Sequence, residues 1–370
     1  MVNFLSLKLP KLDFISLGAV LGLVTIGFST IQSTILAGGE SESLIKIQAL
    51  ALVLGLMVFW FVYSLDFRVL PFFSLPFYIF AVASLVLLFV FGENIRGSIR
   101  WFNLGNFLFQ PSEMAKPFLV VSFCAFFAYF KERVNQWRIL ILLIILAVLP
   151  LGLILKQPDF GTFIVITFSL GLLFLASPLK LSRWLPLILA TLALLPLLYS
   201  SLAPYQKARV QTFFSPQSDP LGSGYNVIQS KIAVGSGEFW GRGWGRGTQS
   251  SLRFLPERHT DFIFATYAEE TGFIGCLFLL LLYIVIFIRS LVILARSDNL
   301  LGSLLVLGSM GAIFSQVAIN IGMNIGLLPV TGIPLPLVSY GGSQMVTTFF
   351  LLGIIASVAK GSGTLYNTSS

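Results

Sequence analysis

The stretch of the sequence with the clearest chemical potential is LPERHTDFIFATYAEETGFIG, residues 255–275. It places the only histidine of the chain, His259, two residues before Asp261, and it carries two adjacent acids, Glu269 and Glu270, into an otherwise apolar segment. A carboxylate in the place of Asp261 can act as a general base that takes a proton from an attacking hydroxyl. The two glutamates need polar partners, because a charge buried among apolar groups is costly.

Charged residues in two other stretches stand in similar surroundings. In RGSIRWFNLGNFLFQPSEMAK, Arg100 precedes a predicted helix for which Ser112 is the expected N-cap. Glu113 and Lys116 follow three residues apart, so they share one helix face, where they either pair or together line a polar cavity. In KQPDFGT, Asp159 stands in a turn, where it either satisfies its own backbone or faces the same cavity.

A glycine-rich stretch, GSGEFWGRGWGRGTQS, alternates glycine with Trp240, Arg242, Trp244 and Arg246. Glycine lets backbone N–H groups approach an anion, and the guanidinium fork matches the oxygens of a phosphate. The same pattern suits a flexible loop that tryptophans anchor at a membrane surface. We expect anchoring for Arg242, which lies between the two tryptophans, and phosphate contact for Arg246, which lies nearer to Asp261.

The rest of the chain predicts an integral membrane protein. Of its 370 residues, 56% are hydrophobic and 10% are charged, and the mean hydropathy of +0.91 leaves too little polar surface to coat a soluble globule. Ten apolar runs are long enough to cross a bilayer core of about 30 Å as helices. The expected spans are 14–37, 44–65, 69–91, 112–130, 139–155, 161–177, 184–201, 262–288, 300–324 and 343–359. The predicted fold class is therefore all-α and polytopic, in a single domain over residues 1–370.

Basic residues orient these spans. With a cytoplasmic N-terminus, the inside segments hold Lys8, Lys11, Arg68, Lys131, Arg133, Arg138, Lys180, Arg183, Arg289, Arg296 and Lys360. The short outside loops hold only Arg96, Arg100 and Lys156, so the asymmetry fits the positive-inside rule and places both termini in the cytoplasm. The net charge of +8 is then mostly an orientation signal, with a contribution from attraction to anionic membrane lipids, and it does not indicate a nucleic-acid partner.

Polar sequence gathers on the outer side of this topology. A large extracytoplasmic loop covers 202–261, and Thr260 is the expected N-cap of the helix after it, with Asp261 in that helix's first turn. GLLPVTGIPLPLVSYGGS, residues 326–343, has too many prolines and glycines for a helix and is too apolar for a solvated loop, so it predicts a re-entrant outer loop that lines a cavity. The inside loops are short and lack a phosphate-binding loop or a dinucleotide fingerprint. The function is therefore expected at the outer face.

The sequence resembles the SEDS family of cell-wall polymerases, the relatives of RodA and FtsW. Four stretches carry the resemblance, in the family's order and across nearly the whole chain: GSIRWFNLGNFLFQPSEMAKP, KQPDFGT, GWGRGTQSSLRFLPERHTDFIFATYAEETGFIG and GLLPVTGIPLPLVSYGGS. The segment GTQSSLRFLPERHTDFIF looks more like the RodA branch than the FtsW branch. The departures, Met114 and Phe160 where leucine is usual, are conservative.

The resemblance implies a peptidoglycan glycosyltransferase of the bacterial cytoplasmic (inner) membrane. Such an enzyme polymerises lipid II into glycan strands at the outer face, releases undecaprenyl pyrophosphate, and serves cell-wall elongation and shape maintenance. Carried over by motif, Asp261 is the catalytic acid/base. The residues expected to bind substrate, from the resemblance and the stretches above, are Arg100, Glu113, Lys116, Asp159, Arg246 and His259.

The resemblance also implies partners, while the residues leave two other functions open, a flippase and a purely structural scaffold for a division or elongation complex, although a scaffold would not need His259, Thr260 and Asp261. The expected partners are lipid II, the nascent glycan and a class B penicillin-binding protein. A divalent cation, Mg²⁺ or Mn²⁺, is attributed to the family, but no ligand set for a metal can be read from this chain. A flippase for lipid-linked sugars would also carry intramembrane charges, but it should show them along the full depth of the membrane. Here they cluster at the outer ends of the helices, which favours the enzyme.

Overall fold

A computed structural model describes residues 13–39, 41–95, 98–103, 105, 108–180, 182–186, 207, 212–213, 215, 224–252 and 254–361. Its helices are α1 (Phe14–Gly38), α2 (Ser43–Ser64), the 3-10 helix η1 (Phe67–Phe73), α3 (Ser74–Phe91), α4 (Pro111–Tyr129), α5 (Trp137–Lys156), α6 (Phe160–Ala176), α9 (Tyr225–Ser236), α10 (Thr248–Ser251), α11 (Ile263–Ala295), α12 (Leu300–Asn324) and α13 (Gly342–Gly361). Three short antiparallel strands, β1 (Glu93–Ile95), β2 (Ser98–Asn103) and β3 (Leu108–Phe109), form a small sheet between α3 and α4. The protein is all-α and polytopic, as the sequence predicts.

Nine of the ten predicted spans coincide with helices in the described part of the chain. Their ends agree within two residues, except that α11 continues seven residues past the predicted end to Ala295. Most of the remaining predicted span, 184–201, lies outside the described residues. Among the described residues, seven helices are long and apolar enough to cross a membrane, with η1 and α3 counted together as one, and α6 is a shorter apolar helix. The turn at 157–159 separates α5 from α6, so the two stretches are separate helices, as the charge asymmetry requires.

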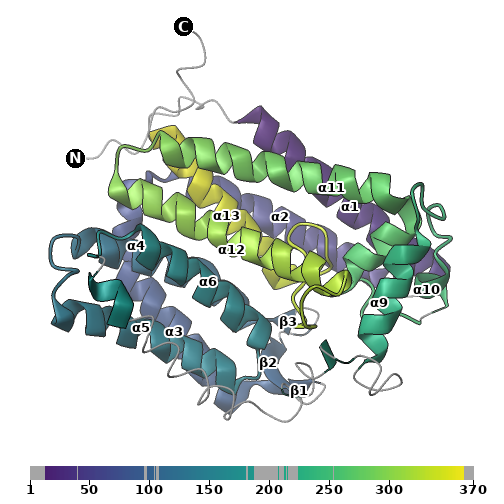
Figure 1. The fold of residues 1–370 in the computed structure, drawn as a ribbon, viewed down its shortest axis with the longest axis horizontal. Helices are drawn as coiled ribbons and strands as arrows, with labels where there is room; N and C mark the ends of the chain where they lie inside the picture. The colour runs from purple at the N-terminus through teal and green to yellow at the C-terminus, as the bar shows by residue number, and fades with distance from the viewer. Residues whose placement is uncertain are drawn as a thin grey trace, which may run out of the picture.

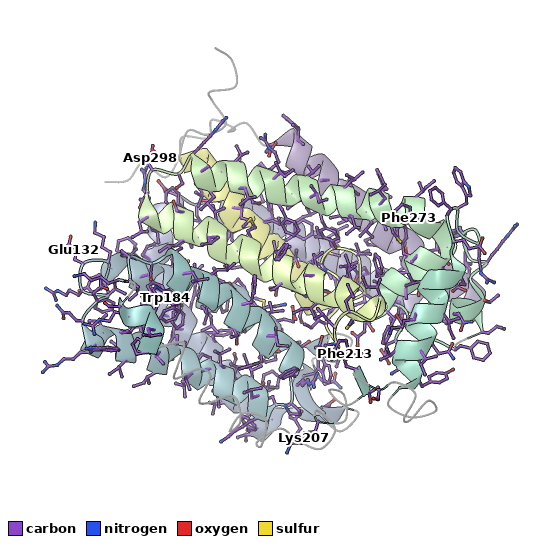
Figure 2. All side chains as sticks on the ribbon, in the orientation of Figure 1. Glu132, Trp184, Lys207, Phe213, Phe273 and Asp298 are labelled. Atoms are coloured by element: carbon purple, nitrogen blue, oxygen red, sulfur yellow. The ribbon has the colours of Figure 1, made fainter. Side chains whose placement is uncertain are left out.

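Two helices form the centre of the bundle. Figure 1 shows α12 and α13 running through the middle, with α1 and α11 on one side and α3, α4, α5 and α6 on the other. Within their most apolar windows, 72% of α12 and 83% of α13 is buried, against 22% of α2 and of α3. Side chains project outward all around the bundle (Figure 2). Large apolar side chains at its periphery are exposed, among them Phe72, Val90 and Phe91 at 68–81% exposure. Such a surface suits lipid and not water.

The start of α1 is tied to α11 at one end of the bundle. The Asp13 carboxylate accepts hydrogen bonds from Arg289 Nε at 2.7 Å and from Ser16 Oγ at 2.7 Å. Burial acts to raise the pKa of Asp13, but the hydrogen bonds and the Arg289 charge outweigh it and hold that pKa below its ordinary value. Asp13 is therefore ionised at neutral pH and contributes a charged tie between the two helices.

Candidate active site

The connection between α12 and α13 is an irregular segment inside the protein. Residues 326–341 contain no helix or strand, and from Thr331 to Ser339 most residues are buried. Gly332 has a φ of 73° and Leu337 a φ of 66°, so the chain turns sharply twice. The segment lies against α1, where a β-carbon on Gly27 would approach Val338 O to 2.4 Å. The predicted re-entrant loop is thus present, and we call residues 326–341 the re-entrant loop.

Amide side chains from the surrounding helices hold the carbonyl groups of this loop. Gln316 Nε2 donates to Pro334 O at 3.2 Å, and Gln344 Nε2 donates to the same oxygen at 3.0 Å. On α2, Gln48 donates to Ser339 O at 3.1 Å and accepts from the backbone N–H of Gly341 at 3.1 Å. These bonds satisfy backbone groups that have no helical partner, which is the condition for irregular backbone at membrane depth.

Asp261 lies in the turn just before α11, beside the re-entrant loop. Its backbone carbonyl accepts hydrogen bonds from Asn320 Nδ2 at 2.9 Å and Asn324 Nδ2 at 3.0 Å, and its side chain is half-buried. A β-carbon on Gly332 would lie 3.4 Å from Asp261 Oδ2, so the loop passes directly beside the carboxylate.

Two predictions for this turn are wrong. Helix α11 begins at Ile263 with Phe262 as its N-cap, so Asp261 precedes the first turn. Thr260 is not the N-cap, because its hydroxyl donates to the carbonyl and the carboxylate of Glu257, both at 3.2 Å. The asparagines of α12 bind the Asp261 carbonyl in place of a helical partner.

The turn and the loop are also joined by hydrogen bonds and a ring contact. Ser339 Oγ donates to Thr260 O at 2.6 Å, and Tyr340 N donates to His259 O at 2.8 Å. The rings of His259 and Tyr340 meet edge to face with their centroids 5.6 Å apart. The HTD triplet, which is His259, Thr260 and Asp261, and the re-entrant loop are therefore held together as one structural unit.

Glu113 and Lys116 form an ion pair at the start of α4. Lys116 Nζ lies 2.6 Å from Glu113 Oε2, and it also donates to Gln316 Oε1 at 3.0 Å. Both side chains are at most 5% exposed. Of the two alternatives that the sequence left open, the structure shows the pair. Since Gln316 in turn binds Pro334 O, the pair is connected to the re-entrant loop.

Asp159 joins three elements at the same end of the bundle. It caps α6 by accepting from Thr162 N at 3.2 Å, and its other oxygen accepts from Ser112 Oγ at 2.7 Å. The guanidinium of Arg100 on β2 lies 3.9 Å from Asp159 and binds the carbonyls of Gln157 and Pro158. Asp159 is thus both a backbone cap and part of a buried polar cluster.

The N-cap predicted for α4 is also wrong. Helix α4 starts at Pro111, and its N-cap is Gln110 without a capping side chain. Ser112 lies in the first turn and is 1% exposed, and its hydroxyl is used by the Asp159 carboxylate. A buried carboxylate is the stronger acceptor, which explains why it takes this donor.

The glycine-rich stretch docks on a break in α11. Gly272 has φ 66° and ψ −164°, which interrupts the helix, and the backbone N–H of Phe273 donates to Glu238 O at 2.9 Å. On the other side of the break, Arg242 N donates to Glu269 O at 2.9 Å. A β-carbon on Gly241 would come within 2.2 Å of Glu270 O. Glycine is therefore needed here for close backbone approach, and we call residues 237–247 the docked loop.

The two glutamates of α11 hold this docked loop and its neighbours. Glu269 Oε1 accepts from the backbone N–H of Gln249 at 2.9 Å and from Thr248 Oγ1 at 3.2 Å. Glu270 Oε1 accepts from Ser33 Oγ on α1 at 2.6 Å and from Gly245 N at 3.2 Å. The partners that the sequence requires for these acids are thus the loop, α10 and α1.

The arginines of the docked loop differ in their contacts. Arg242 is exposed and donates to Ser236 O at 3.1 Å and Thr248 Oγ1 at 3.4 Å, so its guanidinium braces the loop. Trp244 Nε1 donates to Ser29 O on α1 at 3.1 Å. Arg246 is exposed, and within the described residues its guanidinium makes none of these bracing contacts. Arg246 is the arginine left accessible to an anion.

Sequence reasoning missed the amides of α12. Gln316, Asn320 and Asn324 are spaced by four residues, so they lie on one face of the helix, and all three are at most 3% exposed. Amides at that spacing in an otherwise apolar helix could have predicted a buried polar face, because polar side chains inside a membrane bundle form hydrogen bonds between helices. Arg258, in the turn before α11, is also 2% exposed and was not predicted to be buried.

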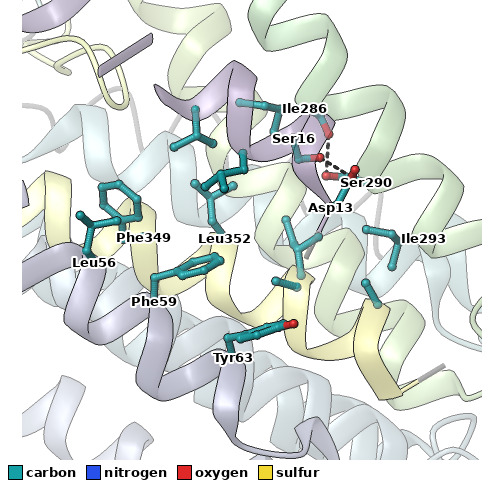
Figure 3. Close-up of a pocket in the computed structure, with 15 residues that line it drawn as sticks. Asp13, Ser16, Leu56, Phe59, Tyr63, Ile286, Ser290, Ile293, Phe349 and Leu352 are labelled. Atoms are coloured by element: carbon teal, nitrogen blue, oxygen red, sulfur yellow. Dashed lines mark hydrogen bonds between the residues drawn. The ribbon is translucent and has the colours of Figure 1, made fainter. Parts of the chain in front are cut away.

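Neither a metal cluster nor the apolar cavity of Figure 3 defines a second site near Asp261. Among the residues that the structure describes, no three His, Cys, Asp or Glu side chains are grouped to hold a metal ion. The cavity of about 90 Å³ in Figure 3 lies between α1, α2, α11 and α13 and is lined mostly by apolar side chains such as Phe59 and Leu352, with Asp13 also among the lining residues. It reaches Ala359, about 25 Å along α13 from Gly342 at 1.5 Å per residue. It therefore extends from the middle of the bundle, at Phe349, toward the end opposite Asp261.

The comparisons with known proteins decide the family. Residues 11–363 match the model of the FtsW/RodA/SpoVE family, described as cell cycle protein. The chain belongs to the FtsW/RodA/SpoVE family. A relative within it is the peptidoglycan glycosyltransferase MrdB of Escherichia coli (strain K12), which is 40% identical over 327 residues, or 87% of each chain.

Solved structures agree with this FtsW/RodA/SpoVE membership. One, described as "Structural coordination of polymerization and crosslinking by a peptidoglycan synthase complex", matches with a TM-score of 0.79 and 32% identity, covering 95% of this chain and 98% of the other. The rod shape determining protein RodA of Thermus thermophilus matches with a TM-score of 0.69 and 28% identity, covering 94% and 96%. The resemblance to RodA and FtsW that the motifs indicate is thereby confirmed.

Proposed function

We propose that this chain is a peptidoglycan glycosyltransferase that polymerises lipid II at the outer face of the bacterial cytoplasmic membrane. The observation that carries the proposal is the unit formed by the HTD triplet and the re-entrant loop, in a chain 40% identical to a named peptidoglycan glycosyltransferase. Because relatives that span the same length are named as transferases, this function is favoured over a flippase.

The reaction needs a base for the attacking hydroxyl and a fixed cation for the leaving pyrophosphate. A glycan hydroxyl attacks the sugar carbon of lipid II, a glycosidic C–O bond forms, and the bond to the lipid pyrophosphate breaks. Asp261 takes the hydroxyl proton, and undecaprenyl pyrophosphate leaves with the bonding electrons. Arg246, with an exposed guanidinium, is proposed to bind the pyrophosphate, and His259 is proposed to line the acceptor side.

The other predicted site residues act on the wall of the cavity in this proposal. Arg100, Glu113, Lys116 and Asp159 contact protein groups, and they join β2, α4, α6 and the re-entrant loop. In this proposal the four side chains hold the wall of the substrate cavity in place and act through that wall.

The orientation follows from the positive-inside rule. The end of the bundle with Asp13, Arg289 and Lys360 is proposed to be cytoplasmic, with both termini there, and the Asp261 end to be external. A class B penicillin-binding protein is the proposed partner, which is consistent with the likeness to a peptidoglycan synthase complex.

Purified protein reconstituted with its cognate partner and lipid II tests the proposal, with glycan strands resolved on a gel. The wild type should make polymer, and Asp261→Asn should make none, because an amide keeps the shape but cannot accept the proton. The matched control is Asp66→Asn, whose carboxylate is 51% exposed near η1 and should not matter. Polymer at the wild-type level from Asp261→Asn would remove Asp261 as the base, and absence of polymer from the wild type would remove the function.

A further inference from the structure

The amide side chains of α12 make contacts that deepen the proposed function, on which this inference rests. Asn320 Nδ2 lies 2.9 Å from the carbonyl of Asp261 and 2.7 Å from the carbonyl of Ile333, which precedes Pro334 in the re-entrant loop. Asn320 is 0% exposed. One amide group thus joins the backbone of the proposed base to the loop beside its carboxylate.

Asn324, one turn further along α12, completes the contact. Its Nδ2 donates to Asp261 O at 3.0 Å and to Asn320 O at 2.8 Å, while its Oδ1 accepts from Ala265 N in the first turn of α11 at 3.2 Å. Because Asp261 and Asn320 present carbonyl oxygens, and Ala265 presents an N–H, only one orientation of this amide satisfies all three. Asn324 therefore fixes both the carbonyl of Asp261 and the start of the helix that follows it.

The need for such anchors follows from the backbone at Asp261. The residue precedes α11, so its position is not set by the helix, and its carboxylate faces Gly332, where the loop has a φ of 73°. A base must be held close to its reactive geometry, since a misplacement of about 1 Å can cost about 100-fold in rate. Buried amides on a rigid central helix supply that constraint.

We propose that Asn320 and Asn324 are positioning residues for glycan polymerisation, which fix the Asp261 carboxylate by binding its backbone carbonyl and hold the re-entrant loop against it. Neither side chain is exposed to a substrate, so both act through Asp261. Gln316 extends the same row on α12 to Pro334 and to Lys116, so the row also connects the ion pair of α4 to the loop.

The test replaces Asn320 with leucine, which has a similar volume and no hydrogen bonds, in the full-length protein. Backbone hydrogen exchange is measured for residues 256–262 and 326–341, and kcat and KM for lipid II are measured on the same preparations. Exchange in both segments should rise at least fivefold, and kcat should fall at least tenfold with KM within twofold of the wild type. The matched control is Ser309→Ala, because Ser309 is buried on the same helix and, among the described residues, its hydroxyl has no partner. Ser309→Ala should leave the hydrogen exchange of both segments, kcat and KM unchanged.

Several results separate the outcomes. In a folded Asn320→Leu protein, unchanged hydrogen exchange at 256–262 overturns the inference, and so does an unchanged kcat. A raised KM with kcat intact also overturns it, because that result would place Asn320 in substrate binding. If the leucine variant does not fold, Asn320→Ser and Asn324→Ser are measured in the same way and judged by the same criteria. If the wild type makes no polymer while exchange rises as expected, the anchoring of the turn stands and the proposed function fails.

Discussion

The ion pair between Glu113 and Lys116 gives the sharpest energetic prediction. Both side chains are at most 5% exposed, and Glu113 Oε2 faces only Lys116 among the described residues. Removal of one partner leaves the other as an uncompensated buried charge, which typically costs about 3–5 kcal/mol. We therefore expect Glu113→Gln and Lys116→Met each to lower the free energy of unfolding by about that amount and to reduce polymerisation strongly.

The double variant distinguishes a pair from two separate roles. Additive effects would cost about 6–10 kcal/mol, whereas a coupled pair predicts that Glu113→Gln with Lys116→Met costs no more than either single change, because no buried charge remains. The assay is unfolding in detergent, followed by tryptophan fluorescence, together with the glycan gel on the same samples. Polymerisation should stay low in the double variant, since Gln316 has lost the donor at its Oε1.

An exposed pair supplies the control. Arg68 lies 4.0 Å from Asp66, with the two side chains 62% and 51% exposed, so Arg68→Met should cost about 0–1 kcal/mol. Additive losses in the Glu113 and Lys116 cycle would refute the reasoning, because the two side chains would then stabilise the protein independently of each other.

Three further predictions concern other parts of the molecule. Arg246→Lys should reduce polymerisation at sub-saturating lipid II, because an ammonium does not reproduce the guanidinium fork; equal activity would place Arg246 in membrane anchoring. Gly241→Ala should abolish polymerisation, because the new β-carbon would displace the docked loop. Gly245 has a similar φ of 68° but open space at the β-carbon, so Gly245→Ala should lose only the activity that backbone strain costs. Equal losses of polymerisation in the two variants would rule out the steric explanation. Asp13→Asn should lower the melting temperature at neutral pH. Since the pKa of Asp13 is depressed, the difference in melting temperature between the variant and the wild type should persist on acidification and shrink only below pH 3.8, the ordinary pKa of the group. Loss of that difference near pH 6 would contradict the ionised tie between Asp13 and Arg289.

The sequence predicted the helices well because an apolar run of bilayer length can satisfy its backbone N–H and C=O groups in lipid only as a helix. It also placed Glu113 and Lys116 on one helix face, since a spacing of three fixes that face, but it left open whether the two side chains pair. It failed at the helix starts, where Ser112 and Thr260 are good caps by type. Their hydroxyls instead bind Asp159 and Glu257, and these partners are set by the fold and by a local turn that composition does not reveal.

The site was only half visible for a related reason. Asp261 stands out as an acid beside a histidine, but the groups that hold it come from Asn320 and Asn324, about sixty residues later in the chain. Their spacing of four is readable, yet their partners are backbone carbonyls, which carry no signature in the sequence. The dual role of Asp159 was likewise open, because a turn residue and a buried acceptor have the same local pattern.

The burial of α12 and α13 has a consequence for how the protein is made. These two helices are the least apolar of the seven candidate spans and also the most enclosed, and α12 carries a row of amides that lipid cannot satisfy. During synthesis they leave the ribosome after the helices that will surround them. We therefore expect the earlier helices α1, α2, α4, α6 and α11 to assemble first around a space, which we call the vestibule. The helices α12 and α13 would then insert into this vestibule as a hairpin, and not directly into lipid. A chain truncated after α11 should leave that vestibule open and become a substrate for membrane proteases, while α12 and α13 expressed alone should integrate poorly.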